Sequence, residues 1–180
     1  YGMNLTAPTS PELMFSITPT NPDFSRMGQI WVKPTPAKIK TSETDMGTPV
    51  LIFGGGYDTC YEDESYQVGS TTSTLTNQRN LACNRTEDTA AIGNTVYIIN
   101  AKTGALIWSA TNDDNPNLTN SIVGGITVLD RNNDGFMDGI YFADLGGQVF
   151  RADFINAGFV MPSSANATEE QTATSFSNTR

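Results

Sequence analysis

The apolar residues of this chain come in short runs that end at Gly, Pro, Asn or Asp, and this pattern constrains the fold most. No segment repeats its apolar positions at the 3.6-residue period of an amphipathic helix over a useful length. Short apolar or alternating runs between turn residues are typical of β-strands. We therefore predict an all-β fold.

The strand pattern recurs along most of the chain. The predicted strands are residues 13–18, 31–41, 49–55, 95–101, 105–111, 121–130, 139–144 and 148–154. Pro34 and Pro36 lie inside the second of these, which predicts an edge or irregular strand because proline donates no ladder hydrogen bond. The large aromatic residues on strand positions are predicted to be core, namely Trp31, Tyr97, Trp108, Tyr141 and Phe150.

Several of these strands belong to a repeat. Residues 96–108 form two apolar strands around an Asn-Lys-Thr-Gly turn, and weaker copies occur near residues 1–15, 53–58 and 144–153. Aligning the copies places Asn4, Asn100 and Asp153 at one repeat position. A repeat of about four short antiparallel strands is the pattern of a β-propeller. The first unit is cut at its middle, and the second and third cover about 31–111 and 121–154.

These units predict the domain organisation. Two and a half blades do not close a ring of the usual four to eight. We therefore expect either a fragment of a larger protein or blades that pack in another way. The partial propeller covers residues 1–158. Residues 159–180 are rich in Ser, Thr, Ala and Asn, which predicts a flexible polar tail or linker.

A polar insertion at 59–94 separates the second and third strands of the second unit and holds both cysteines, Cys60 and Cys83. Neither cysteine lies in a C-x-x-C pair, so we predict one disulfide formed in an oxidising compartment. The alternative is a redox or nucleophilic thiol. A polar loop of this kind serves either as a specificity element or as a tolerated surface excursion, and the sequence leaves both open.

The sharpest local signal is residues 130–138, Asp-Arg-Asn-Asn-Asp-Gly-Phe-Met-Asp. Its oxygen-bearing side chains fall at positions 1, 3, 5 and 9, with Gly at position 6. Calcium prefers six to eight oxygen ligands at about 2.3–2.6 Å, and alternate side chains of one loop can supply them. The predicted ligands are Asp130, Asn132, Asp134 and Asp138, with the backbone carbonyl of Phe136.

This loop differs from that of an EF-hand. Position 12 is Tyr141 where an EF-hand has Glu, and apolar strands flank the loop where an EF-hand has helices. We therefore expect weaker calcium binding, with water completing the coordination. The alternative is a polar hairpin turn without metal. Magnesium suits a crowded loop less well, because it keeps several of its waters.

Charge and composition exclude several functions. The net charge of -9 leaves no basic surplus for nucleic-acid binding, and no apolar run reaches the about 20 residues of a membrane span. The absence of histidine excludes His-dependent catalysis and His-ligated metals. The acidic runs at 62–64 and 113–114 fit solvated loops better than a glycosidase pair. We expect no enzymatic activity.

The order of the motifs resembles the C-terminal domain of the PilC/PilY family, large secreted proteins tied to bacterial type IV pili. The resemblance covers about residues 27–154. It rests on the ordered set of Met-Gly-Gln-Ile-Trp with Pro-Thr-Pro, Ile-Phe-Gly-Gly-Gly-Tyr-Asp, Val-Tyr-Ile-Ile-Asn-Ala-Lys-Thr-Gly, and the 130–138 loop running into Ile-Tyr-Phe-Ala-Asp-Leu-Gly-Gly. The insertion at 59–94 departs from the family pattern.

The resemblance implies a seven-bladed, quinoprotein-like propeller of which this is the later part. It also implies a secreted, pilus-tip location among minor pilins, and roles in pilus biogenesis, twitching motility and adhesion to host or abiotic surfaces. Calcium at 130–138 would tune pilus extension and retraction, with the family ligands carried onto Asp130, Asn132, Asp134 and Asp138. Two alternatives remain: a quinoprotein-like dehydrogenase fragment and an integrin-like calcium propeller adhesin.

Overall fold

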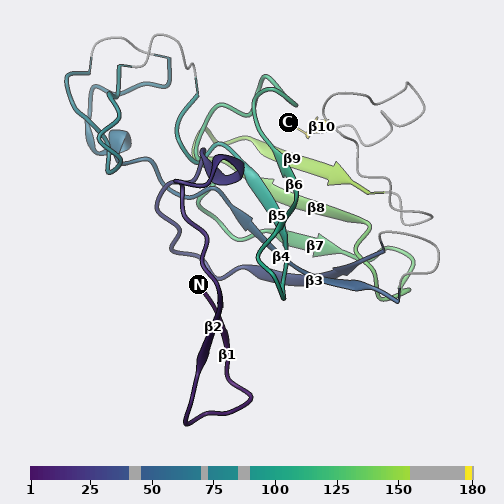
Figure 1. Ribbon diagram of the computed structural model, residues 1–180. Helices are drawn as coiled ribbons and strands as arrows, with labels where there is room; N and C mark the ends of the chain where they lie inside the picture. The colour runs from purple at the N-terminus through teal and green to yellow at the C-terminus, as the bar shows by residue number, and fades with distance from the viewer. Residues whose placement is uncertain (41–45, 70–72, 85–89, 155–176, 180) are drawn as a thin grey trace.

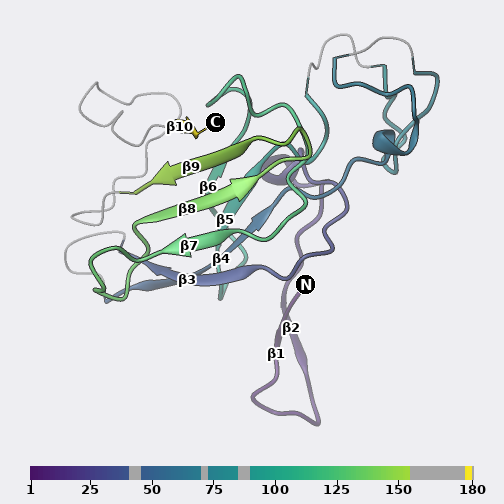
Figure 2. The ribbon, with the colours of Figure 1, turned by 180° about the vertical axis from the view of Figure 1, so that it is seen from behind.

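The computed structural model describes residues 1–40, 46–69, 73–84, 90–154 and 177–179, where its regular structure is almost entirely β. Three antiparallel sheets follow one another along the chain (Figures 1 and 2). The first sheet has two strands and the others have four, so the predicted all-β architecture of two and a half blades is confirmed. In the described part of the chain, no helix has the length and apolar character needed to cross a membrane.

Each sheet uses its strands in sequence order. The half-blade pairs β1 (Gly2–Asn4) with β2 (Glu12–Phe15). The second blade contains β3 (Thr35–Ile39), β4 (Thr48–Gly54), β5 (Val96–Asn100) and β6 (Leu106–Ala110). The third blade contains β7 (Thr127–Leu129), β8 (Gly139–Ala143), β9 (Val149–Asp153) and β10 (Ser177–Thr179). Two short 3-10 helices, η1 (Pro22–Phe24) and η2 (Thr59–Glu62), lie outside the sheets.

The second blade is covered on both faces. Successive side chains of a strand point to opposite sides, so each strand can contribute to two separate cores. In β5, Ile98 joins the core that the second and third blades share, which includes Phe150 of β9. Its neighbours Tyr97 and Ile99 join a separate core with Phe24 of η1. The continuous apolar run of β5 therefore reflects a strand covered on both faces.

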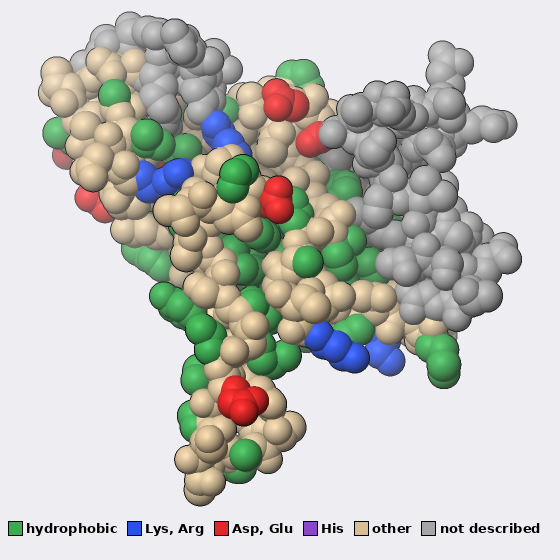
Figure 3. Space-filling model, viewed as in Figure 1, with side chains coloured by type: hydrophobic (Ala, Val, Ile, Leu, Met, Phe, Trp, Pro, Cys, Tyr) green, Lys and Arg blue, Asp and Glu red, His purple; other side chains and the backbone are tan. Residues whose placement is uncertain are grey.

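The half-blade is less covered. Hydrophobic side chains gather along its projecting hairpin in Figure 3. The exposed members are Tyr1, Met3, Leu5, Leu13 and Met14. The hairpin corresponds to the third and fourth strands of a blade. Among the described residues β1 pairs only with β2, so the other edge of β1 is unpaired.

The predicted repeat position is confirmed. Asn4, Asn100 and Asp153 are the last residues of β1, β5 and β9, the third strand of each blade. The side-chain oxygen of Asn100 accepts hydrogen bonds from the turn, including Lys102 N–H at 2.9 Å, and that of Asn4 accepts from Thr6 N–H at 3.1 Å. The side chains of Asn4 and Asn100 therefore close the turns that follow them, whereas Asp153 pairs with two arginines.

The predicted strand at 31–41 is shorter than expected. It starts at Thr35 as β3, which lies at the sheet edge with Pro36 inside it, as predicted. The prediction that Trp31 is core is wrong, because its side chain is 78% exposed. Pro34 lacks an N–H and restricts the residue before it, so the chain enters the sheet only after the proline. Of the other predicted core aromatics, Tyr97, Trp108 and Phe150 are buried and Tyr141 is partly buried.

The predicted strand at 121–130 is also shorter, because only Thr127–Leu129 pairs with β8. The residues before it bond to loops of the second blade. Ile122 N–H donates to the Gly93 carbonyl at 2.9 Å, and the Ile122 carbonyl accepts from Gly56 N–H at 3.0 Å. This segment therefore joins two blades and extends neither sheet.

The predicted tail at 159–180 lies outside the described residues except for 177–179. These three residues pair antiparallel with β9 as β10. The sequence predicts no strand there, because Ser-Asn-Thr carries no apolar alternation.

The insertion leaves the second blade between β4 and β5, and its described parts are 59–69, 73–84 and 90–94. The predicted disulfide is confirmed: Cys60 and Cys83 are bonded, with 5.5 Å between their Cα atoms. The buried carboxylate of Asp58 accepts hydrogen bonds from Cys60 N–H at 3.2 Å, Asn77 Nδ2 at 3.1 Å and Ile92 N–H at 2.9 Å. One side chain thus ties together the start, middle and end of the insertion.

Candidate metal centre

The loop 130–138 connects β7 to β8 at the end of the third blade (Figure 2). Two of its residues have a positive φ, Asn133 at 58° and Gly135 at 87°. Gly accepts this backbone conformation without the steric cost that a Cβ brings, which explains glycine at the sixth position. The structure brings all five predicted ligand residues into this one tight turn.

The first two predicted ligands bind the backbone of the loop. The Asp130 carboxylate accepts from Asp134 N–H at 3.2 Å and from Gly135 N–H at 2.9 Å. The side-chain oxygen of Asn132 also accepts from Asp134 N–H, at 3.1 Å. These bonds hold both oxygen atoms within the turn. Each oxygen keeps at least one further lone pair, because an ionised carboxylate can accept about four hydrogen bonds and an amide oxygen two.

The later ligands are held in the same way. The Asp134 carboxylate accepts from Phe136 N–H at 2.9 Å, and the Asp138 carboxylate accepts from Arg131 N–H at 2.5 Å. The Phe136 carbonyl accepts no hydrogen bond from any residue that the structure describes. It is therefore available as an oxygen ligand.

The donor set fits calcium. Three carboxylates, one amide oxygen and one free carbonyl are hard oxygen donors, which calcium prefers, and they bring three negative charges. Over the described ranges, no three acidic, cysteine or histidine side chains converge on one point as a formed metal cage. The loop therefore has the donors and the turn of a calcium site, with its carboxylates turned to backbone N–H groups.

The loop is fixed to both four-stranded blades. Met137 N–H donates to the Lys38 carbonyl of β3 at 2.9 Å, and the Lys40 ammonium lies 4.9 Å from the centre of the Phe136 ring. Phe154 N–H, just after β9, donates to the Asp138 carbonyl at 2.8 Å. A change in the order of the loop would therefore reach β3 of one blade and the end of β9 in the other.

The sequence does not predict the ion-pair group beside the loop. Arg131 and Arg151 both pair with Asp153, the last residue of β9, the latter at 2.6 Å. The hydrogen bond to Asp153 raises the pKa of Arg151 above its usual value. The repeat alignment assigns Asp153 a turn position only, and the sequence carries no signal for an ion pair between the β7–β8 loop and β9.

Comparison with known proteins supports the fold. No family model and no curated protein matches the chain. Among solved structures, the crystal structure of the Pseudomonas aeruginosa PilY1 C-terminal domain resembles it, with a TM-score of 0.56 over 98% of this chain and 22% sequence identity. This chain spans 29% of the length of that one. At this identity the likeness shows the fold alone, which is that of part of the PilY1 C-terminal propeller.

Proposed function

We propose that this chain is a calcium-binding, non-enzymatic part of a type IV pilus-associated protein. It is secreted to the cell surface or pilus tip, where minor pilins and a host or abiotic surface are its partners. Its roles are in pilus biogenesis, twitching motility and adhesion. The observation that carries the calcium part is the 130–138 loop, which gathers five oxygen donors in one turn. The PilY1-like fold and the disulfide support the pilus-associated, extracellular setting.

The residues of the loop suggest how it would act. Asp130, Asn132, Asp134 and Asp138, with the Phe136 carbonyl, would hold the ion. Bound calcium supplies positive charge that offsets the repulsion among the three carboxylates. The bonds from Met137 to Lys38 and from Phe154 to Asp138 would then hold the ordered loop against both blades. The surface formed by these strand ends is where a pilus partner would sense the change.

The test is calcium titration by calorimetry into the metal-stripped 180-residue chain. We expect one calcium per chain and no measurable binding by Asp134→Ala, because Asp134 is the central carboxylate of the loop. Glu62→Ala is the matched control, because it removes a carboxylate of the insertion and should bind like the unchanged chain. A folded chain that takes up no calcium, or an Asp134→Ala variant that binds normally, would refute the site.

The pilus part is tested separately in piliated cells. Cells whose full-length protein carries Asp134→Ala should assemble or retract pili abnormally, and cells with Glu62→Ala should not. Normal piliation and twitching in both strains would refute a role of the loop in pilus function, even if calcium binds.

A further inference from the structure

A row of aromatic rings runs from the segment before β3 into the insertion. The ring centroids of Trp31 and Tyr57 are 5.8 Å apart with planes tilted by 35°, and those of Tyr57 and Tyr61 are 5.9 Å apart at 32°. Tyr66 stands edge-on to Tyr61, with centroids 5.3 Å apart. The first ring of the row is highly exposed, whereas Trp108, the other tryptophan, is only 8% exposed. An exposed indole at the end of a row of tilted and edge-on rings is a surface suited to a ligand.

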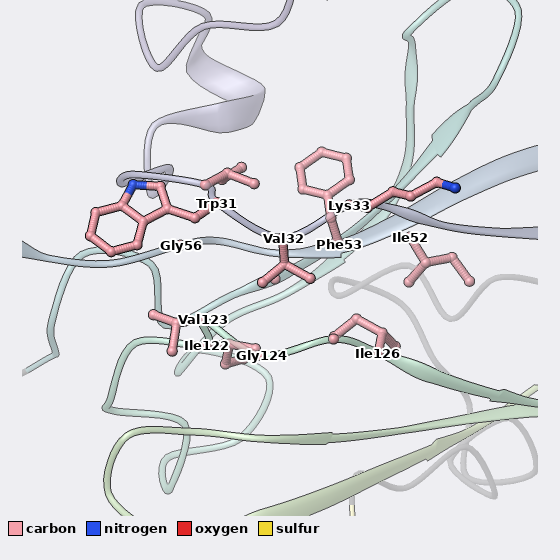
Figure 4. Close-up of a pocket in the computed structure, with 13 residues that line it drawn as sticks. Trp31, Val32, Lys33, Ile52, Phe53, Gly56, Ile122, Val123, Gly124 and Ile126 are labelled. Carbon is pink, nitrogen blue, oxygen red and sulfur yellow. The ribbon is translucent and has the colours of Figure 1, made fainter.

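A cavity of about 240 Å³ opens beside Trp31 and Tyr57. It is lined by Gln29, Trp31, Val32, Tyr57, Val123 and Leu145. Figure 4 is a close-up of a neighbouring pocket that shares Trp31, Val32 and Val123 with this cavity, and it shows the Trp31 indole turned away from Ile52 and Phe53. Pockets for drug-sized ligands have volumes of about 300 Å³ or more, so this one suits a single ring-sized group.

Three of the residues that line the cavity carry polar side-chain groups. The Gln29 amide, the Trp31 indole N–H and the Tyr57 hydroxyl form no hydrogen bond with any described residue. The amide and the hydroxyl can donate or accept hydrogen bonds, and the indole N–H can donate one. A sugar ring has the complementary chemistry, because its C–H face packs on an aromatic ring while its hydroxyls bond at the rim.

The charges around the cavity favour a neutral ligand. None of its lining residues is charged. Burial, followed by the nearby charges of Glu62 and Asp58, raises the pKa of the Tyr57 hydroxyl, which therefore stays protonated at neutral pH. The same negative charges repel an anion, so sialic acids and phosphates are disfavoured.

We infer that the cavity between Trp31 and Tyr57 binds a neutral carbohydrate, with one sugar ring stacked on Trp31 and its hydroxyls bonded to Gln29 and Tyr57. A longer glycan would continue along Tyr61. The inference gives the adhesive part of the proposed function a ligand, and it does not depend on the calcium loop.

The test starts with the 180-residue chain on an array of neutral and sialylated oligosaccharides, in buffer that contains EGTA. The best neutral glycan is then titrated by calorimetry and by tryptophan fluorescence. Because Trp108 is buried against Phe154, a fluorescence change on binding reports Trp31. Working in EGTA separates this result from that of the calcium titration.

Variants locate the binding. Trp31→Ala should weaken it by at least about tenfold, because an aromatic anchor contributes a large share of such an interface. Tyr57→Phe keeps the ring and removes the hydroxyl, so it should weaken binding less. Tyr1→Ala is the matched control, since Tyr1 is an exposed aromatic residue outside the cavity, and it should bind like the unchanged chain.

Three results would overturn the inference. The first is the absence of binding to any neutral glycan on the array. The second is binding that Trp31→Ala leaves intact. The third is a preference for sialylated over neutral glycans, which would contradict the charge argument.

Discussion

Replacing Asp58 should weaken the attachment of the insertion to the second blade. The side chain is fully buried, and its carboxylate accepts from two backbone N–H groups and the Asn77 amide. A hydrogen bond to a charged partner contributes about 1.5–3 kcal/mol, and a buried donor left without an acceptor costs about 1–3 kcal/mol. The bonds share one carboxylate and are not independent, so we expect Asp58→Ala to lower the free energy of unfolding by about 3–5 kcal/mol.

Asp58→Asn refines the prediction. The amide keeps one acceptor oxygen but turns an N–H₂ group toward donors, so it should lose about half as much stability. The matched control is Asp113→Ala, which removes the same charge from an exposed loop position and should change stability by less than about 0.5 kcal/mol.

The assay is equilibrium urea unfolding followed by circular dichroism, with limited proteolysis to locate new cleavage. Cuts should appear within the insertion and spare β5 and β6. Asp58→Ala within about 0.5 kcal/mol of the unchanged chain would refute the reasoning, as would equal losses for Asp58→Ala and Asp113→Ala.

Two further predictions concern backbone space and pH. Gly93→Ala should prevent folding or destabilise the chain by well over 3 kcal/mol, because the new Cβ would overlap the Gly56 carbonyl. The matched control is Gly69→Ala, because Gly69 has nearly the same φ (81°, against 83° for Gly93) but open space around its Cα. Gly69→Ala should cost only about 1–2 kcal/mol in urea unfolding. Burial raises the pKa of Tyr97 from 10.0 to about 12, although nearby Thr95 and Arg26 lower it slightly. The folded state therefore holds the hydroxyl proton more tightly than the unfolded state does. The resulting contribution to the free energy of unfolding is complete below pH 10 and falls by about 1.4 kcal/mol per pH unit toward pH 12. Tyr97→Phe should reduce that alkaline loss and raise stability at pH 7 by up to about 1 kcal/mol, because the Tyr97 hydroxyl has no hydrogen-bond partner of normal geometry in the described residues. An unchanged pH profile, or similar losses for the two glycine variants, would contradict these predictions.

Local chemistry makes much of the fold predictable from the sequence. Turn residues recur where the chain must reverse, so the repeat of Asn4, Asn100 and Asp153 is enough to mark the third strand of each blade. The disulfide follows from composition, because two cysteines outside a metal or redox motif form one simple pair. The 130–138 loop can be proposed as a calcium site from the sequence because its oxygen donors are contiguous there.

The wrong predictions arise where tertiary contacts determine the local structure. An apolar aromatic residue next to a strand is usually core, yet Trp31 is exposed because Pro34 delays the start of β3. Residues 121–126 have a strand-like composition, but their backbone bonds to Gly56 and Gly93, more than 25 residues away in sequence. The ring row from Trp31 to Tyr66 joins separate segments, so no spacing rule could reveal it.

The two candidate sites lie at opposite ends of the same strands. Trp31 precedes the start of β3, whereas the Lys38 carbonyl near its other end accepts a hydrogen bond from Met137 N–H of the 130–138 loop. β7 likewise starts beside β3, where the Thr35 hydroxyl donates to the Ile126 carbonyl at 2.8 Å, and ends at the loop. A change in the order of the 130–138 loop can therefore affect the aromatic cavity only through strands that are already packed and hydrogen-bonded. A close-packed sheet transmits little of a local ordering change unless it has a second arrangement, so the two sites should act independently.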